Sequence, residues 1–277
     1  MAFNPLINAN GKLRNGWWIA IFFVVLFALL FPLMLVARGG DAQVPIWAQA
    51  VVLLLASAIC QALRRRPMAE VLGALDLRWP LQFATGLALG AALMLAPALL
   101  LWALGAVRWQ VGAAGGSALL PALVLFAAVA VTEELMFRGF LFQRLVAGLG
   151  PWFAQLLIGG LFVLTHADAL RGAGAIGFMA MINIFVASIL FGAAFLRTQS
   201  LAMPIGLHLA ADFVQGGVLG FGVSGNEETG LLRPVLSGPD WLTGGAFGLE
   251  ASVPGLAAVA TLTALVMFAR RPPSQES

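Results

Sequence analysis

Two adjacent glutamates and an arginine lie at the end of a long apolar run, in the segment VTEELMFRGF. Ionisable side chains are costly in apolar surroundings and mark functional sites there. Glu134 and Arg138 are four residues apart, so on a helix they share a face, in the order that favours an ion pair. Glu133 is turned by about 100° from Glu134. The spacing therefore predicts that Arg138 neutralises Glu134 and that Glu133 needs a partner from another helix.

The only two histidines of the chain lie in other apolar runs. His166 ends the segment FVLTH, and His208 precedes Asp212 by four residues in GLHLAADF. That spacing places His208 and Asp212 on one helix face, where the acid can orient the histidine or share a metal ion with it. Asn183, in a further apolar run, is a neutral polar candidate. Because both histidines stand among apolar residues, the pattern indicates a function.

These side chains could form a hydrolytic centre inside a membrane. A carboxylate in a low-dielectric site can take a proton from water, and histidines can donate to a developing oxyanion. Glu133, His166, His208 and Asp212 could instead hold a divalent metal such as Zn²⁺, which would activate a bound water. The residues leave both mechanisms open. They also leave open that the acidic pair and its arginine form only a packing clamp between helices.

The apolar runs that carry these residues are expected to be helices. The chain of 277 residues is 61% hydrophobic and 10% charged, against about 45–50% apolar content in soluble domains. Open strands cannot satisfy their backbone groups in lipid. The runs cover residues 16–37, 44–63, 81–106, 118–146, 151–167, 173–196, 201–221 and 253–269. We therefore expect an all-α, polytopic membrane protein with about eight transmembrane helices, forming a single membrane domain over residues 1–277.

The basic residues predict the orientation of these helices. Arginine and lysine are retained on the cytoplasmic side, and with the amino terminus inside most of them lie there, including Arg270 and Arg271. The exceptions are Arg38, Arg108, Arg171 and Arg233. We expect both termini in the cytoplasm, in a multi-pass protein of the cell (inner) membrane. The longest connection, residues 222–252, would then be extracytoplasmic; its acids are Glu227, Glu228, Asp240 and Glu250.

Charge and cysteine content exclude two other classes of function. The net charge of +3 comes from scattered basic residues without interleaved aromatics, which is not the pattern of a nucleic-acid-binding surface. The single cysteine, Cys60, excludes an intramolecular disulfide and a cysteine-based metal cluster. The expected partners are the lipid bilayer and a membrane-embedded peptide or protein, and not nucleic acid.

Taken together, the motifs resemble the CAAX-protease and bacteriocin-processing family of intramembrane proteases, also called CPBP or Abi. Its three motifs are a Glu-Glu pair followed by Arg after three residues, Phe and His separated by three, and His and Asn or Asp separated by three. They stand here, in order, as EELMFR, FVLTH and HLAAD. The approach LRTQSLAMPIGLH is also similar to the family's lead into its third motif. The resemblance covers about residues 118–221, the expected catalytic core.

This resemblance implies a hydrolase, an intramembrane endopeptidase in which Glu133 activates the attacking water. It implies that His166 positions or polarises this water and that His208, with the residue at 212, stabilises the oxyanion. Glu134 and Arg138 would be structural partners that hold the first motif. The substrate would be a peptide or a membrane-protein segment, since nothing in the sequence indicates a prenylated one.

One position departs from the usual motif. Asp212 stands where the family often has Asn, and an ionised carboxylate cannot donate a hydrogen bond to an oxyanion. Asp212 must therefore be protonated, orient His208 or bind metal. Asn183 is a candidate substitute donor.

A non-catalytic membrane protein is the alternative reading. Buried Glu, His and Asp also serve proton relays, so a proton- or ion-coupled transporter fits the composition, as does a bacteriocin-immunity or scaffolding factor. The polar sites cluster in the middle of the chain and no internal repeat is evident, whereas many transporters are built from repeats. This difference favours the enzyme.

Overall fold

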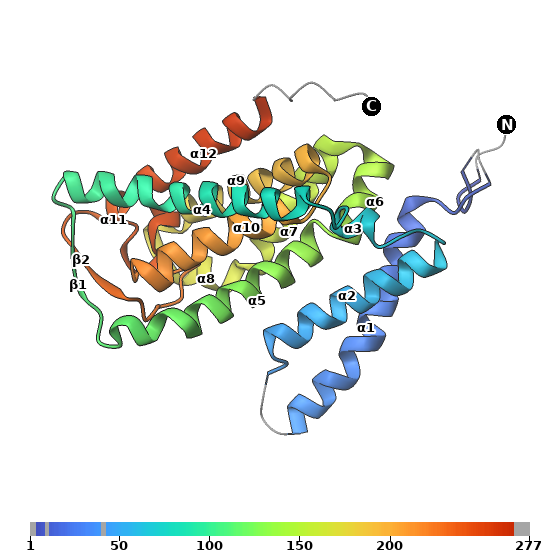
Figure 1. Cartoon of the computed structure of the whole chain (residues 1–277), viewed down its shortest axis with the longest axis horizontal. Coiled ribbons are helices and arrows are strands. Elements are labelled where there is room, and N and C mark those ends of the chain that lie inside the picture. Colours follow the sequence, from blue (N-terminus) through green and yellow to red (C-terminus); the bar gives the residue numbers. More distant parts are fainter. Residues whose placement is uncertain (1–3, 9–10, 40–42, 269–277) are drawn as a thin grey trace.

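The computed structural model describes residues 4–8, 11–39 and 43–268, and helices dominate it (Figure 1). The longer helices are α1 (Asn15–Gly39), α2 (Ile46–Leu63), α4 (Arg78–Ala103), α5 (Leu119–Phe137), α7 (Pro151–Thr165), α9 (Gly177–Thr198) and α12 (Val253–Phe268). The shorter ones are α3 (Ala69–Leu72), α6 (Phe140–Leu149), α8 (Ala167–Gly172), α10 (Ala202–Asp212) and α11 (Asp240–Thr243). Every apolar run found in the sequence is therefore mainly helical.

The described residues contain five stretches that are long and apolar enough to cross a membrane. They are Asn15–Gly39, Ile46–Leu63, Arg78–Ala103, Gly115–Leu149 and Gly174–Thr198. The helices α7 and α12 are apolar but shorter. A multi-pass helical membrane protein is thus confirmed, while the count of eight spans and the cytoplasmic termini stay predictions. Arg270 and Arg271 lie outside the described residues.

Two of the apolar runs are not single α-helices. The run 118–146 divides into α5 and α6 at Gly139, where a Cβ atom would collide with the carbonyl oxygen of Leu135. The run 201–221 begins as α10 and continues as a π-helical segment, η3 (Phe213–Val218). Such wide turns are often found at functional sites, and this one begins directly after Asp212.

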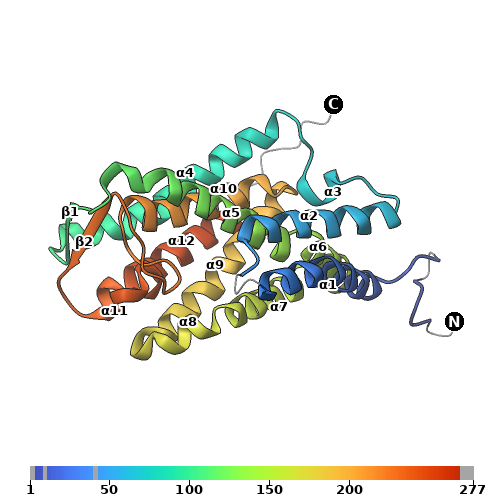
Figure 2. The same ribbon diagram turned by 90° about the horizontal axis from the view of Figure 1, so that it is seen from below.

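The bundle is arranged around α10, whose residues are all buried. This helix packs against α4, α5 and α9, and α12 covers α4 and α9. Gly86 and Gly90 of α4 meet the carbonyl oxygens of Met203 and Leu207 on α10 so closely that a Cβ atom would not fit. Small residues permit such close approach where no hydrophobic effect drives membrane helices together. The pair α1 and α2 lies to one side, against α5 and α6 (Figures 1 and 2).

A small folded region closes one end of the bundle, at the left of Figure 1. Its strands β1 (Val107–Val111) and β2 (Leu232–Leu236) pair antiparallel, with Val107 opposite Leu236. Short helical turns complete it: η1 (Gly115–Ala118), η2 (Gly174–Ile176), η4 (Gly245–Phe247) and η5 (Leu249–Ala251). The all-α expectation holds for the bundle, and the small sheet is an addition that was not predicted, because β1 and β2 come from connections that showed no clear strand pattern.

Candidate active site

Glu134 and Arg138 form the buried ion pair that their spacing predicts. Both side chains are 0% exposed, and Glu134 Oε1 lies 3.1 Å from Arg138 Nη1. The other terminal nitrogen of Arg138 donates to the backbone oxygen of Ser188, at 2.9 Å, and to its hydroxyl, at 2.8 Å. The rings of Phe162 and Phe191 each have their centroid 5.1 Å from the guanidinium carbon. The pair therefore joins α5 to α9 in a dry environment.

The same glutamate also fixes His208. His208 Nδ1 lies 3.0 Å from Glu134 Oε1, and because a carboxylate paired with arginine can only accept, Nδ1 carries the proton. The imidazole stacks on Phe191, with ring centroids 4.7 Å apart. Glu134, Arg138, Ser188 and His208 form a connected cluster, which we call the floor. The contact between Glu134 and His208 is not visible in the sequence, because it depends on how α5 and α10 align.

The free edge of His208 faces two more carboxylates. Its Nε2 lies 3.4 Å from Asp212 Oδ2 and 3.7 Å from Glu133 Oε2. The side chain of Glu133 is 26% exposed, against 7% for His208 and 0% for Glu134. Glu133 is thus the member of the acidic pair that reaches open space. Asp212 lies where it can orient His208, one of the three roles left open for it.

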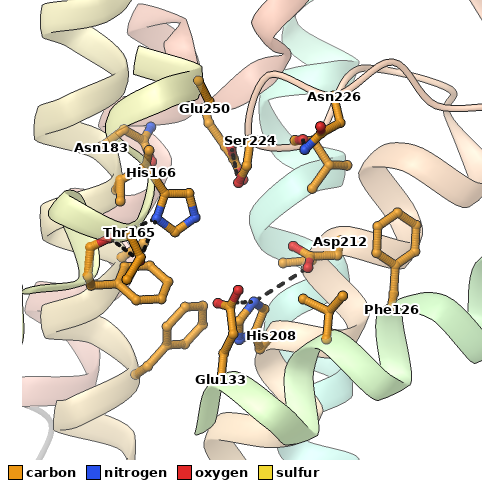
Figure 3. Close-up of a pocket in the computed structure, with 18 of the residues that line it drawn as sticks. Phe126, Glu133, Thr165, His166, Asn183, His208, Asp212, Ser224, Asn226 and Glu250 are labelled. Atoms are coloured by element: carbon orange, nitrogen blue, oxygen red, sulfur yellow. Dashed lines mark hydrogen bonds and ion pairs between the residues drawn. The ribbon is translucent and has the colours of Figure 1, made fainter. Parts of the chain in front are cut away.

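His166 stands on the opposite side, at the junction of α7 and α8 (Figure 3). Its Nδ1 lies 2.7 Å from the backbone oxygen of Phe162. A carbonyl oxygen can only accept, so Nδ1 donates and Nε2 of the neutral ring is left as an acceptor. Figure 3 shows this second nitrogen directed toward the space between His166 and Glu133.

A cavity of about 580 Å³ brings the predicted residues together. Glu133, His166, His208 and Asp212 all line it, and so does Asn183. Glu134 and Arg138 are not among the lining residues, consistent with a supporting position beneath the surface. The size is that of a site for a small molecule or for a few residues of a peptide.

The far wall of this cavity comes from the connection 222–252. Besides Val223, it contributes the polar lining residues Ser224, Asn226, Glu228 and Glu250, which we call the roof. Oε2 of Glu250 accepts hydrogen bonds from the Ser224 backbone N–H, at 2.9 Å, and from its hydroxyl, at 3.2 Å. Burial, and secondarily the charge of Asp212, raise the pKa of Glu250 to about 7. Sequence reasoning missed the roof; its only signal was the acidity of this connection.

The metal alternative concerns the same four side chains. Among the described residues, no group of three or more His, Cys, Asp or Glu side chains is arranged to hold a metal ion. The inner nitrogens of His208 and His166 are taken by Glu134 and by the Phe162 carbonyl. A metal would have to bind through the outer nitrogens, so the metal-dependent mechanism rests on the residue types alone.

Fold and site together define a helical, multi-pass membrane protein with a Glu–His–Asp cluster on the wall of a cavity. Residues 115–214 match the family model for Rce1-like type II CAAX prenyl endopeptidases. This match contains all three motifs and confirms the resemblance to CAAX-type intramembrane proteases. Searches among curated proteins and solved structures gave no match. The matched family is one of peptide hydrolases, and the match covers less than half of the chain.

Proposed function

We propose that the protein is an intramembrane endopeptidase that hydrolyses a peptide bond with a water molecule activated by Glu133. The observation that carries this proposal is that the two adjacent glutamates have different surroundings. Glu134 is bound to Arg138 and His208, whereas Glu133 reaches a cavity that two histidines also line. A carboxylate without an arginine partner in a partly closed site is suited to act as a general base.

The reaction begins with a water between Glu133 and His166. Glu133 takes a proton from this water, and Nε2 of His166 accepts a hydrogen bond from it, which directs the oxygen lone pair at the substrate carbonyl carbon. The new C–O bond gives a tetrahedral intermediate. When it collapses, the C–N bond breaks and the proton held by Glu133 passes to the leaving amine. Water is consumed, and a carboxylic acid and an amine are formed, between which the remaining proton is exchanged to give a carboxylate and an ammonium group.

His208 is placed to stabilise the oxyanion of this intermediate. In its doubly protonated form the ring keeps Nδ1–H on Glu134 and offers Nε2–H to the developing charge. Donors already in position at such a charge are among the largest contributions to catalysis. Asp212 Oδ2 lies 3.4 Å from Nε2. In this scheme it accepts the Nε2–H and orients the ring until the oxyanion takes over that hydrogen, and it is not an oxyanion donor.

The variant Glu133→Gln tests the proposal directly. We expect hydrolysis to fall by about 100-fold to 10,000-fold, the contribution of a general base, while the purified protein keeps its elution profile and melting temperature. The assay incubates the protein in lipid nanodiscs with a peptide mixture in heavy-oxygen water, and mass spectrometry detects the label in new carboxyl termini. Glu227→Gln is the matched control, since Glu227 is exposed and does not line the cavity.

Undiminished label in the Glu133→Gln reaction would refute the role of this residue. Repeating the wild-type reaction after dialysis against a chelator separates the two mechanisms. Direct activation by Glu133 predicts unchanged hydrolysis, whereas loss with chelator and recovery with Zn²⁺ would select the metal-dependent mechanism.

A further inference from the structure

The cavity is strongly acidic away from the proposed reaction centre. Five carboxylates line it, namely Glu133, Asp168, Asp212, Glu228 and Glu250, and no lysine or arginine is among its lining residues. Asp168 is largely exposed and already paired with Arg171. Glu133 and Asp212 face His208. This leaves the two roof glutamates without a cation.

The roof glutamates also have unused acceptor capacity. Ser224 engages one oxygen of Glu250, and no hydrogen bond to the other is present among the described residues. Glu228, within the described chain, has neither a hydrogen bond nor an ion pair, and its pKa is raised by burial and by the charge of Asp212. Two partly buried carboxylates are therefore held close to a third, Asp212, and among the lining residues only His208 supplies an opposing charge.

Asn183 is an independent sign of a polar ligand in this cavity. It is 4% exposed and lines the cavity. Its side chain makes no hydrogen bond within the described residues, and its amide is not among the fully buried unpaired polar atoms, so the amide is accessible from the cavity. Figure 3 shows Asn183 near His166, on the side of the cavity that Glu250 also borders. Its amide can accept from a cation through the oxygen and donate to a peptide carbonyl through the nitrogen.

We propose that the roof is a subsite for a cationic side chain, lysine or arginine, that lies within a few residues of the bond hydrolysed. The inference rests on the proposed function and adds the substrate class to it. The ammonium or guanidinium group would bind between Glu228 and Glu250, with Asn183 supplying a further polar contact. The favoured substrate is thus a peptide segment with a basic residue near the scissile bond.

Peptide binding to the cleavage-incompetent Glu133→Gln protein tests this subsite without requiring turnover. The probes are fluorescent leucine–alanine membrane peptides in which one norleucine at a time is replaced by lysine. Binding is measured in detergent micelles by anisotropy at pH 8, above the pKa of about 7 of Glu250. At one position we expect lysine to bind about tenfold tighter than norleucine, the effect of a hydrogen bond to a charged group.

Roof variants made in the same Glu133→Gln background identify the source of this preference. Glu228→Gln and Glu250→Gln should each reduce it by about threefold or more. Glu227→Gln, which removes the same charge from the exposed neighbour of Glu228, should leave it unchanged. Glu228→Gln guards against misfolding of the Glu250 variant, because Glu228 holds no structural hydrogen bond within the described chain. The variant Asn183→Leu should weaken lysine binding at the same position.

Equal binding of the lysine and norleucine peptides at every position would overturn the subsite. So would a lysine preference that survives both roof variants, or that Glu227→Gln reduces equally. Hydrolysis by the unmutated protein is scored separately. If the lysine preference depends on the roof but the protein does not hydrolyse peptides, the proposed function is refuted and the subsite stands. If the protein hydrolyses peptides without that preference, the subsite is refuted and the proposed function stands.

Discussion

The floor and the roof of the cavity differ in whether their carboxylates are paired with a basic side chain. In the floor, Glu134 has a buried arginine 3.1 Å away, and that arginine is further held by Ser188. In the roof, the hydrogen bonds to Glu250 come from the neutral donors of Ser224, no lysine or arginine lines the cavity, and Glu228 and Asp212 lie near. The negative charge of the floor is thus neutralised by an arginine of the protein, and the negative charge of the roof is not.

This difference separates a supporting role from a recognition role. The floor is carried by the helices α5, α9 and α10, which hold side chains more precisely than loops do. The roof is carried by a long connection, the kind of segment in which binding residues are concentrated. A balanced cluster keeps His208 in place before substrate arrives, while an unbalanced one gains a partner only when substrate is bound.

Removing the floor cation should have the largest effect. Arg138→Met leaves Glu134 as an uncompensated buried charge, and breaking a buried pair in this way costs about 3–5 kcal/mol. We expect little folded protein after purification, measured as loss of the monodisperse peak and a lower melting temperature. The double variant Arg138→Met, Glu134→Gln removes both charges of the buried pair and should recover much of the stability. A normal melting temperature for the single variant would mean that the floor does not depend on its ion pair.

The variant Asp212→Asn tests whether a carboxylate is required at the position that lies between the floor and the roof. The amide oxygen can still accept from His208 Nε2, and its NH₂ group can donate to an oxyanion. We expect hydrolysis of a neutral peptide to stay within about tenfold of the original rate, given the modest size of one neutral hydrogen bond. Asp212→Leu keeps neither contact and should be slower. Loss in the Asn variant as complete as in Glu133→Gln would show that a carboxylate is required at position 212.

The pH dependence of stability gives the smallest expected effect and concerns the roof alone. Glu250 has its pKa raised from an ordinary 4.5 to about 7 by burial and the charge of Asp212. Between these values the folded protein holds a proton that the unfolded chain has lost, so the free energy of unfolding falls as pH rises from 4.5 to 7. Above that window this contribution stays constant.

Comparison with Glu250→Gln isolates this contribution from other titrating groups. The melting temperature of the unmodified protein should fall by a few degrees more than that of the variant across the window. In an Asp212→Asn background the difference in melting temperature between the protein with Glu250 and its Glu250→Gln variant should be smaller, because the charge of Asp212 is the second cause of the raised pKa of Glu250. Parallel melting curves for the unmodified protein and Glu250→Gln would show that Glu250 titrates normally.

The sequence predicted the part of the site that depends on spacing within one helix. The pairing of Glu134 with Arg138 and the shared face of His208 and Asp212 follow from four-residue separations, and both are present. Contacts between helices could not be predicted, because they depend on the depth and rotation of each helix. The hydrogen bond from His208 to Glu134 and the position of Ser188 belong to this second group.

Two features of the fold left weaker signals. Gly139 directly after the first motif could have indicated the break between α5 and α6, yet the surrounding apolar residues continue without interruption. The connection 222–252 has no periodic pattern, so neither β2 nor the roof was evident. Its acidity was visible, but composition alone does not tell whether a loop faces water or a cavity.

The glycine contacts between α4 and α10 also determine which parts of the cavity can move. Gly86 and Gly90 hold α10 against α4 at backbone distance, and Gly206 does the same from the other side, against the carbonyl of Phe83. Sliding of either helix would bring backbone atoms into collision. We therefore expect α4 and α10 to stay fixed relative to each other, with His208 and Asp212 held on α10. We therefore expect any movement that admits a peptide to occur on the other side of the cavity, in the connection 222–252 and at the junction of α7 and α8.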